Sequence, residues 1–393
     1  MTIDIEKARA DTPGADRVLH FNNAGAALMP TPVVKAYIDH IRLESEIGGY
    51  EAQAARKPSL EGTYAALARL INGEADEIAL LENATRAWDM AFYGLAATFE
   101  PGDKILTSEA EYASNALAFL QVARRSGVTI ETVPSDASGK LSVEALKQMV
   151  DDRVRMIAVT HVPTNGGLVN PSAEVGAVAR AAGVPFLLDA CQSVGQMPID
   201  VKAIGCDMLS ATGRKYLRGP RGTGFLWVRA DLAGSFEPPF LDLHAATWTA
   251  RDQFDIQPSA RRFETFEGNI AGRIALGVAV EYALGWGLDA AYDRIGYLAD
   301  SLRNGLSAIP GVRVRDLGEE RCGIVTFTAE QTAPEVIQGA LGEKSIHVSV
   351  SPRAFTLFDM EKRDLASVVR ASLHYYNTED EVARFCSELK ELV

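Results

Sequence analysis

Residues 186–201, FLLDACQSVGQMPIDV, and residues 212–224, TGRKYLRGPRGTG, decide the fold of this chain. The first segment is an apolar run that ends in the acid Asp189, and the second is a glycine-bounded loop that carries Lys215. A short apolar run before a turn is typical of a buried strand in a parallel sheet. Ligands of open parallel sheets bind beyond the C-terminal ends of the strands, so we expect Asp189 and Lys215 to reach the same site.

Strand and helix patterns alternate on both sides of these segments, which predicts a mainly parallel sheet covered by helices on both faces. The predicted strands are residues 77–81, 104–107, 129–133, 156–160, 185–188 and 225–228. The predicted helices are residues 63–71, 84–99, 116–125, 141–150 and 173–182. The residues that follow the strands should gather at one edge of the sheet, namely 83–85, 111–115, 160–165, 189–192 and 212–215.

The pattern changes from about residue 269. A long helical pattern runs to residue 306, an apolar run follows at 323–327, and an amphipathic helix is predicted over 379–392. We therefore predict an α/β protein with an N-terminal segment over residues 1–20, a large α/β domain over 21–268 and a smaller α+β domain over 269–393.

Composition excludes several classes of function. The 393 residues are 47% hydrophobic and carry a net charge of -13, which argues against a nucleic-acid binder. No apolar stretch approaches the roughly 20 residues that span a bilayer. The first 21 residues lack the apolar core of a signal peptide, so we expect a cytoplasmic protein. The four cysteines, Cys191, Cys206, Cys322 and Cys386, show no metal-ligand spacing, and no metal site is predicted.

The pairing of Lys215 with Asp189 is the combination that pyridoxal phosphate requires. A lysine amine forms a Schiff base with the cofactor, and a carboxylate keeps the pyridine nitrogen protonated so that the ring acts as an electron sink. The two residues, with the glycines around Lys215, therefore predict a pyridoxal-phosphate enzyme.

At these residues the chain resembles the class V aminotransferase and cysteine desulfurase family of fold-type-I pyridoxal-phosphate enzymes. The resemblance covers nearly the whole chain, from FNNAG at 21–25 to VRAS at 369–372 and YNT at 376–378. It implies the fold-type-I transferase architecture, a homodimer and a small amino-acid substrate.

The resemblance also assigns roles to single residues. It makes Lys215 the Schiff-base lysine and the proton shuttle, and it pairs Asp189 with the pyridinium nitrogen. Gln192 would hydrogen-bond the phenolic oxygen of the cofactor. Tyr112 occupies the position of the ring that stacks on the pyridine, where desulfurases usually carry histidine. Arg370 matches the arginine that grips the substrate α-carboxylate.

Further residues complete the predicted site. Ala84 and Thr85 match the phosphate-binding turn before a helix, and Thr212 and Arg214 would complete the phosphate site. Thr164 is predicted to contact the cofactor. The remaining candidates are His161 in catalysis, and Asn165 and Arg353 in substrate binding.

Each assignment has a structural alternative. Lys215 could be a surface lysine and Asp189 a helix N-cap, but the motifs that recur with them favour the cofactor roles. Tyr112 could simply cover a loop, Arg370 could form a surface salt bridge, and Arg353 could be solvated. His161 could be a satisfied, partly buried histidine, and we weigh that interpretation equally with a functional one.

The chain departs from the desulfurase pattern in three places. Residues 350–356, VSPRAFT, contain no cysteine where desulfurases carry their sulfur acceptor. Residues 265–269, TFEGN, place an acid near the threonine that family members often donate to the phosphate of the other subunit. Residues 161–167, HVPTNGG, look more like the subgroup that contains C–S lyases.

These departures favour a β-eliminating lyase that acts on a cysteine derivative. The same residues would also serve an aminotransferase or an epimerase, because fold and cofactor do not fix the reaction class. A third hypothesis is a non-catalytic homologue that binds the cofactor.

Overall fold

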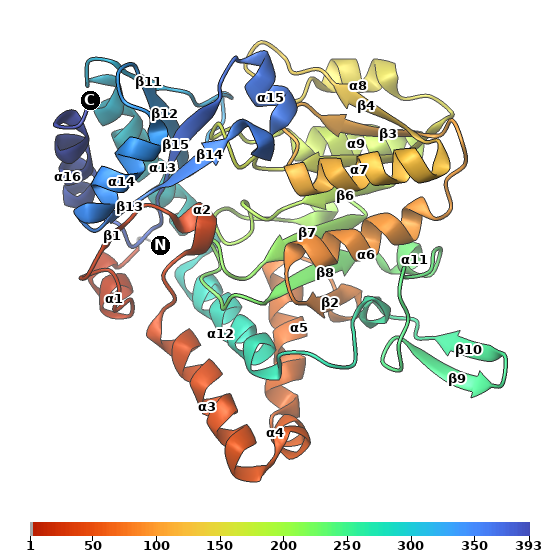
Figure 1. The fold of residues 1–393 in the computed structure, drawn as a ribbon. Helices are drawn as coiled ribbons and strands as arrows, with labels where there is room; N and C mark the ends of the chain where they lie inside the picture. Colours follow the sequence, from red (N-terminus) through yellow and green to blue (C-terminus); the bar gives the residue numbers. More distant parts are fainter. Residues whose placement is uncertain (1–2) are drawn as a thin grey trace.

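A seven-stranded sheet forms the centre of the computed structural model, which describes residues 3–393 (Figure 1). Its strand order is β2-β8-β7-β6-β5-β3-β4. The strands are β2 (Ile78–Leu81), β3 (Lys104–Ser108), β4 (Thr129–Val133), β5 (Val154–Thr160), β6 (Phe186–Asp189), β7 (Met208–Thr212) and β8 (Gly224–Val228). Neighbouring strands are parallel except that β8 runs antiparallel to both β7 and β2. The predicted mainly parallel sheet is confirmed.

The sheet is buried on both faces, which explains why its strands read as continuous apolar runs. In β6 all four residues are buried. Phe186 and Leu188 face one core, and Leu187 between them faces the other, because successive side chains of a strand point to opposite faces.

Helices cover both faces of this sheet. On one face lie α6 (Ala84–Ala96) and α7 (Ala113–Ser126), whose apolar residues share a core with Leu187. On the other face lie α5 (Lys57–Ile71), α8 (Val143–Met149), α9 (Ser172–Ala182) and α12 (Ile270–Trp286). Helix α9 packs closely against the backbone at Ile204. A Cβ atom on Gly176 would lie 1.9 Å from the Ile204 carbonyl oxygen, so only glycine fits there.

A second, four-stranded antiparallel sheet has the order β11-β12-β15-β14. Its strands are β11 (Val312–Val314), β12 (Ile324–Ala329), β14 (Ser349–Pro352) and β15 (Ser367–Ser372), covered by α13 (Leu288–Ser307), α14 (Pro334–Glu343) and α16 (Glu379–Lys390). The N-terminal strand β1 (Leu19–His20) pairs with β13 (Ile346–His347), so the start of the chain joins this part of the molecule.

The predicted long helix over residues 269–306 is wrong. Gly287, whose φ is +81°, separates α12 from α13, and the two helices are bent by 78°. Helix α12 packs against α5 and α3 (Thr31–Ile47), whereas α13 packs against β11, β12 and α16. The division at residue 268 stays a prediction, and these contacts place α12 beside the helices of the large sheet.

Within residues 3–393, no single helix has both the length and the apolar character needed to cross a bilayer. The bent pair α12 and α13 meets that criterion only when the two helices are taken together.

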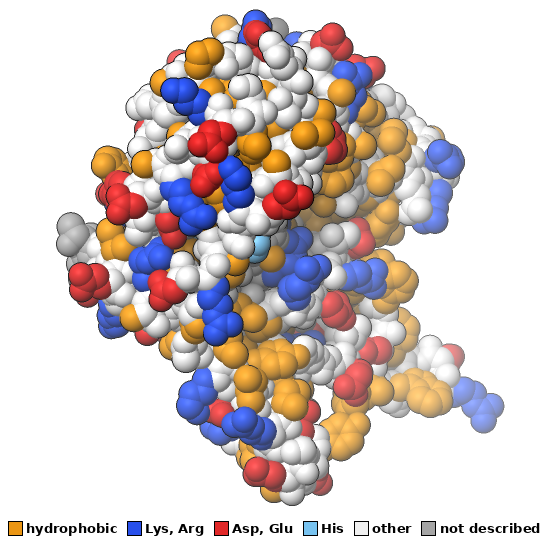
Figure 2. Space-filling view, turned by 60° about the vertical axis from the view of Figure 1, so that its left-hand side comes forward, with side chains coloured by type: hydrophobic (Ala, Val, Ile, Leu, Met, Phe, Trp, Pro, Cys, Tyr) orange, Lys and Arg blue, Asp and Glu red, His pale blue; other side chains and the backbone are white. Residues whose placement is uncertain are grey.

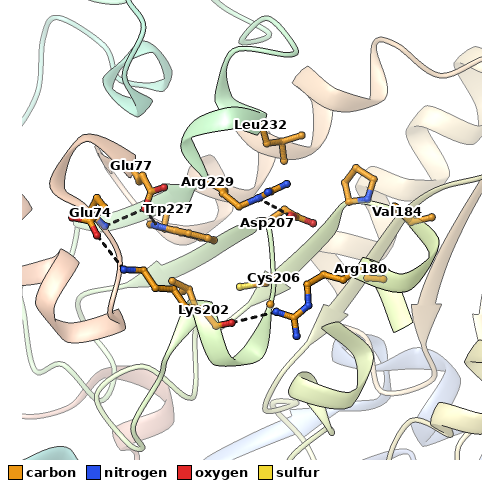
Figure 3. Close-up of a pocket in the computed structure, with 15 residues that line it drawn as sticks. Glu74, Glu77, Arg180, Val184, Lys202, Cys206, Asp207, Trp227, Arg229 and Leu232 are labelled. Atoms are coloured by element: carbon orange, nitrogen blue, oxygen red, sulfur yellow. Dashed lines mark hydrogen bonds and ion pairs between the residues drawn. The ribbon is translucent and has the colours of Figure 1, made fainter. Parts of the chain in front are cut away.

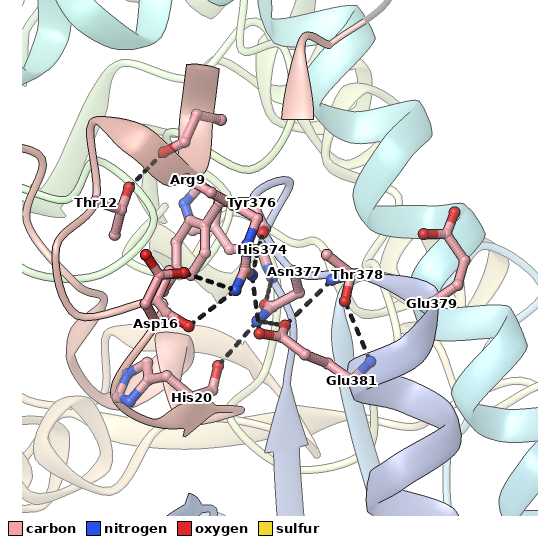
Figure 4. Close-up of polar contacts among 12 residues, drawn as sticks. Arg9, Thr12, Asp16, His20, His374, Tyr376, Asn377, Thr378, Glu379 and Glu381 are labelled. Atoms are coloured by element: carbon pink, nitrogen blue, oxygen red, sulfur yellow. Dashed lines mark hydrogen bonds and ion pairs between the residues drawn. The ribbon is translucent and has the colours of Figure 1, made fainter. Parts of the chain in front are cut away.

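The two ends of the chain are bound to each other (Figure 4). Arg9, on α1 (Ile5–Ala10), donates to Glu381 at 2.8 Å and to the Tyr376 carbonyl at 3.2 Å. Glu381 also accepts from Asn377 at 2.9 Å and forms the capping box of α16 with Thr378. This network fixes the segment around Tyr376 against the N-terminal helix.

Two projecting elements expose apolar side chains. One is the arm formed by α3 and α4 (Gly49–Ala55), and the other is the hairpin of β9 (Ala246–Ala250) and β10 (Gln253–Ile256) (Figure 1). Tyr50 on the arm is 69% exposed, and Trp248 on the hairpin is 78% exposed. Figure 2 shows hydrophobic side chains on the surface of this lower part of the molecule.

Candidate active site

The predicted site lies at one edge of the large sheet. Thr160, Asp189 and Thr212 are the last residues of β5, β6 and β7, and these neighbouring strands are parallel. Lys215 follows in the loop after β7. Because these strands are parallel, their C-terminal ends and the lysine loop lie at the same edge of the sheet.

The Asp189 carboxylate is buried and held from two sides. Asn115 Nδ2 donates to Asp189 Oδ2 at 3.0 Å, and the backbone N–H of Cys191 donates to Asp189 Oδ1 at 3.0 Å. Residues 191–193 form a turn and not an α-helix, so Asp189 closes a turn without capping a helix. No basic side chain lies within 4.0 Å of its carboxylate in the described part of the chain.

Lys215 is partly buried and makes no ion pair within 4.0 Å in residues 3–393. Burial lowers the pKa of its ammonium group, and the positive charges of Arg214 and Arg370 act in the same direction. Cys191 and Asp189 oppose this shift. A lowered pKa increases the fraction of neutral amine, which is the form that attacks an aldehyde.

The loop that carries Lys215 is closed by Arg218, a residue that the sequence analysis did not identify. The Arg218 N–H donates to the Lys215 carbonyl at 2.9 Å, and the Arg218 backbone has a left-handed φ of 59°. Its buried guanidinium donates to the Leu28 carbonyl at 2.8 Å and to the Tyr375 hydroxyl at 2.9 Å. It also lies 4.5 Å from the ring centroid of Tyr376. The loop is thereby bound to both ends of the chain.

Arg370 on β15 reaches the same region from the smaller sheet. Its guanidinium is buried and donates to the hydroxyl oxygens of Thr164, at 2.5 Å, and Ser349, at 3.1 Å. Within residues 3–393 it has no carboxylate within 4.0 Å. Burial lowers the pKa of Arg370 to about 10. A buried guanidinium paired only with hydroxyls fits the carboxylate of a ligand.

Two buried acceptor atoms at this edge have no hydrogen-bond partner among the described residues. Asn165 donates to Thr356 at 3.0 Å and leaves its Oδ1 unpaired. Gln192 donates to the Ala24 carbonyl at 3.1 Å and leaves its Oε1 unpaired. Unpaired buried polar atoms are costly, so both atoms fit hydrogen bonds to a bound cofactor or substrate.

The predicted phosphate residues lie at the start of α6 and in the loop after β7. Helix α6 begins at Ala84, where the first N–H groups have no partner within the helix, and Thr85 is exposed. Thr212 donates to the Thr223 carbonyl at 3.2 Å, and Arg214 donates to the Gly25 carbonyl. Such a helix start together with Arg214 suits a phosphate group.

The remaining predicted site residues are Tyr112, His161 and Arg353. Tyr112 is partly buried as the N-cap of α7. His161 is buried, its Nε2 lies 3.2 Å from the Ser172 hydroxyl, and burial lowers its pKa to about 4, so the ring is neutral near pH 7. The structure does not bring Arg353 to Arg370: its guanidinium donates to the Leu365 carbonyl at 2.8 Å and lies 3.4 Å from Asp364.

Glu111 is a further buried acid that the sequence analysis did not identify as a site residue. It accepts from Thr107 at 2.9 Å and from Asn115 at 2.8 Å, and Asn115 is the residue that also contacts Asp189. The only signal in the sequence was its place in residues 111–115, after a predicted strand.

A cavity of about 570 Å³ lies elsewhere, near the start of β6 and β7 (Figure 3). Two ion pairs line it, with Arg229 3.0 Å from Asp207 and Lys202 3.0 Å from Glu74. None of the predicted site residues lines it. Within residues 3–393, no cluster of three or more His, Cys, Asp or Glu residues could hold a metal ion.

Comparison with known proteins decides the family. The family model described as Aminotransferase class-V matches residues 19–385. The chain belongs to the class-V aminotransferase family. This class-V member is therefore a pyridoxal-phosphate-dependent enzyme, which confirms the predicted fold class, family and cofactor.

Relatives of this class-V enzyme carry desulfurase names. It is 30% identical to a probable cysteine desulfurase of Pyrococcus abyssi, an alignment that covers 99% of this chain and 97% of the relative. It is 31% identical to a probable cysteine desulfurase of Xylella fastidiosa, covering 98% and 95% of the two chains. The enzyme is thus similar over nearly its whole length to proteins named as probable cysteine desulfurases.

Solved structures agree in fold. The cysteine desulfurase of Thermococcus onnurineus NA1, in its apo form, superposes with a TM-score of 0.93 at 28% identity, covering 100% of this chain and 98% of the other. The cystine C–S lyase C-DES, solved with its product cysteine persulfide, gives a TM-score of 0.87 at 24% identity, covering 97% and 99%, and supports the fold alone.

Proposed function

We propose that this enzyme cleaves the C–S bond of a small cysteine derivative by β-elimination. The observation that carries the proposal is the buried Arg370, whose side-chain partners among residues 3–393 are hydroxyls and whose charge helps to lower the pKa of Lys215. Such an arginine would bind the α-carboxylate of an amino acid. The desulfurase names of the relatives support a sulfur-containing substrate.

Four residues would hold the cofactor and move the proton, namely Lys215, Asp189, Gln192 and Tyr112. Bound pyridoxal phosphate supplies an electron sink for the carbanion at the substrate Cα. Lys215 would hold the cofactor and, once its amine is free, would take the Cα proton. Asp189 would keep the pyridine nitrogen protonated, and Gln192 Oε1 would accept a hydrogen bond. Tyr112 at the start of α7 would stack on the ring.

The positions of the thiols support elimination without a sulfur relay through the enzyme. Residues 350–356, which lie in β14 and the short 3-10 helix after it, contain no cysteine. Cys206 and Cys322 are buried, and Cys386 lies on α16. Cys191 is near Asp189 but burial raises its pKa, which disfavours the nucleophilic thiolate. The sulfur would therefore leave with the product.

The test is a product assay on the purified enzyme loaded with cofactor. Cysteine, cystine and thioether conjugates of cysteine are offered with and without an added oxoacid, and pyruvate, ammonia and the released sulfur species are measured. Formation of pyruvate and ammonia in equal amounts without oxoacid is expected from at least one substrate. Failure to form pyruvate from every cysteine derivative would refute the proposal.

A cysteine desulfurase is the second candidate, and the names of the relatives favour it. A desulfurase forms alanine and leaves a persulfide on one of its own cysteines, which intact-mass measurement detects. Cys191→Ser is the matched variant, because Cys191 is the cysteine beside Asp189. Loss of turnover and of the added sulfur mass in this variant would favour the desulfurase, whereas unchanged turnover supports elimination.

Other outcomes of the same assay identify the remaining hypotheses. Product that forms only with an added oxoacid indicates an aminotransferase, and loss of optical activity without product indicates an epimerase. Absence of any spectral change with amino acids indicates a non-catalytic homologue.

We also infer that the enzyme is a homodimer whose subunits cover the exposed arm and hairpin. An isolated two-stranded hairpin is marginally stable in water, and this hairpin exposes Trp248 and Phe254 at paired positions. The arm exposes Tyr50, and apolar surface of this kind fits a second copy of the chain. A cytoplasmic location and the absence of nucleic-acid or membrane partners stay predictions.

A further inference from the structure

We propose that Glu111 is a positioning residue that, through Asn115, holds the Asp189 carboxylate in the orientation that the cofactor requires. This proposal rests on one part of the proposed function, namely that the pyridine nitrogen of the cofactor lies beside Asp189. It does not depend on the reaction class.

Glu111 is a buried carboxylate whose hydrogen-bond partners in the described part of the chain are all neutral. Its oxygens accept from the Tyr112 N–H at 2.8 Å, from the Thr160 N–H at 3.2 Å and from the Thr107 hydroxyl at 2.9 Å. No basic side chain lies within 4.0 Å of it in residues 3–393. A buried acid without a cation is costly, and donors from β3, β5 and the start of α7 offset that cost by fixing its orientation.

Asn115 connects this acid to Asp189. Its Nδ2 lies 2.8 Å from Glu111 Oε1 and 3.0 Å from Asp189 Oδ2, so each of the two amide hydrogens has one carboxylate acceptor. A rotation of the amide by half a turn would place its oxygen against both carboxylates, which repel it. Glu111 therefore permits only one orientation of Asn115, the one that donates to Asp189.

The second oxygen of Asp189 is fixed independently by the Cys191 N–H at 3.0 Å. With both oxygens held, the carboxylate cannot rotate freely. Burial and the charge of Asp189 both raise the pKa of Glu111, which supports electrostatic contact between the two acids, while hydrogen bonds from Thr160 and Asn115 oppose the shift. Loss of Glu111 should therefore change the hydrogen bond between Asp189 and the pyridine nitrogen of the cofactor.

The test compares two isosteric variants of buried acids. Glu111→Gln removes the acid that orients Asn115. Glu77→Gln is the matched control, because Glu77 is also buried and accepts from Trp227 at 2.8 Å and from the Ala230 N–H at 3.0 Å, in contacts that do not include Asp189. The readouts are the affinity of each apoenzyme for pyridoxal phosphate and the ¹⁵N NMR shift of the labelled pyridine nitrogen in the reconstituted protein.

Glu111→Gln should weaken cofactor affinity about tenfold and move the nitrogen shift toward that of the unprotonated ring, as a coupling of about 1.4 kcal/mol implies. Glu77→Gln should lower the melting temperature without changing either readout. In an Asp189→Asn background, Glu111→Gln should change the affinity by less than about twofold, since its effect passes through Asp189. Asn115→Ala, which keeps both acids, should reproduce the nitrogen shift of Glu111→Gln.

The proposal is overturned if Glu111→Gln only lowers the melting temperature, as Glu77→Gln does, or if its effect is the same in the Asp189→Asn background. Asn115→Ala decides the matter by the same two readouts if Glu111→Gln does not fold. No readout involves a substrate, so failure of the lyase assay and failure of this proposal are separate results.

Discussion

The Arg218 N–H donates to the Lys215 carbonyl at 2.9 Å, and the buried side chain of the same arginine contacts both ends of the chain. The position of the cofactor lysine is therefore coupled to segments that are remote in sequence. Arg218 adopts a left-handed backbone and lies among Tyr282, Tyr375 and Tyr376 without a carboxylate within 4.0 Å in residues 3–393.

Two substitutions of Arg218 should distinguish the contribution of its side chain to stability from the strain of its left-handed backbone. Arg218→Ala should lower the free energy of unfolding by about 3 kcal/mol, because buried hydrogen-bond partners and a cation–π contact are lost. Arg218→Gly should cost about 1 kcal/mol less, since glycine adopts φ of 59° without strain. Urea unfolding of the two apoenzymes measures the difference, and equal losses would show that the left-handed backbone adds no strain.

Arg370→Gln should weaken substrate binding and leave the stability of the fold nearly unchanged. The variant should lose about 100-fold in kcat/KM for amino-acid substrates, because a charge-assisted bidentate contact with the carboxylate is removed. Its free energy of unfolding should change by less than about 1 kcal/mol, since no carboxylate among the described residues pairs with the guanidinium and would be left unpaired. Steady-state kinetics and urea unfolding test the two parts, and a strongly destabilised variant would assign Arg370 a structural role.

His161 should make the protein less stable in acid. Burial lowers its pKa to about 4, so between pH 4 and 6.5 the unfolded chain binds a proton that the folded chain does not. Its contribution is complete above pH 6.5 and is lost as the pH falls. Lowering the pH from 6.5 to 5 should cost about 2 kcal/mol through this residue.

His161→Asn should remove that part of the pH dependence. Urea unfolding at pH 7 and pH 5 for the two proteins gives the comparison, and identical slopes would contradict the assignment. His20, whose pKa burial also lowers to about 4, is unchanged in both proteins and contributes equally to each slope.

Trp248→Glu should weaken self-association at least tenfold, because large aromatic side chains dominate the binding energy of interfaces. Tyr297→Glu is the control, since Tyr297 is 57% exposed on α13, away from the hairpin and the arm. Sedimentation velocity over a range of concentrations measures both variants. A monomeric parent protein, or equal weakening by both substitutions, would rule out the hairpin as the interface.

Sequence alone was enough to predict six strands of the large sheet and the edge where Asp189, Thr212 and Lys215 meet, because apolar runs are a local property. The strand β7 (Met208–Thr212) was missed, and the order of the strands, which depends on contacts between distant segments, was not predicted. The break at Gly287 was missed since the apolar pattern continues through it, and only the left-handed φ reveals the turn.

The supporting residues were missed for a different reason. Nothing in the sequence near Arg218 indicates its role, because its partner Tyr375 is 157 residues away. Glu111 lies in a segment that was expected near the site, residues 111–115, and only the contacts of Asn115 with both acids distinguish it. Arg353 is the opposite case. It was predicted to bind substrate, but nothing in the sequence indicated that its guanidinium contacts the Leu365 carbonyl.

The contacts of Arg218 with Leu28 and Tyr375 also constrain the order of events during protein synthesis. A ribosome completes the lysine loop about 160 residues before it releases Tyr375, so the nascent chain carries this loop without its final support. A mature cofactor pocket must therefore form after translation of the C-terminal region. Truncation before Tyr375 would remove the hydroxyl that Arg218 contacts and would leave the lysine loop without this support.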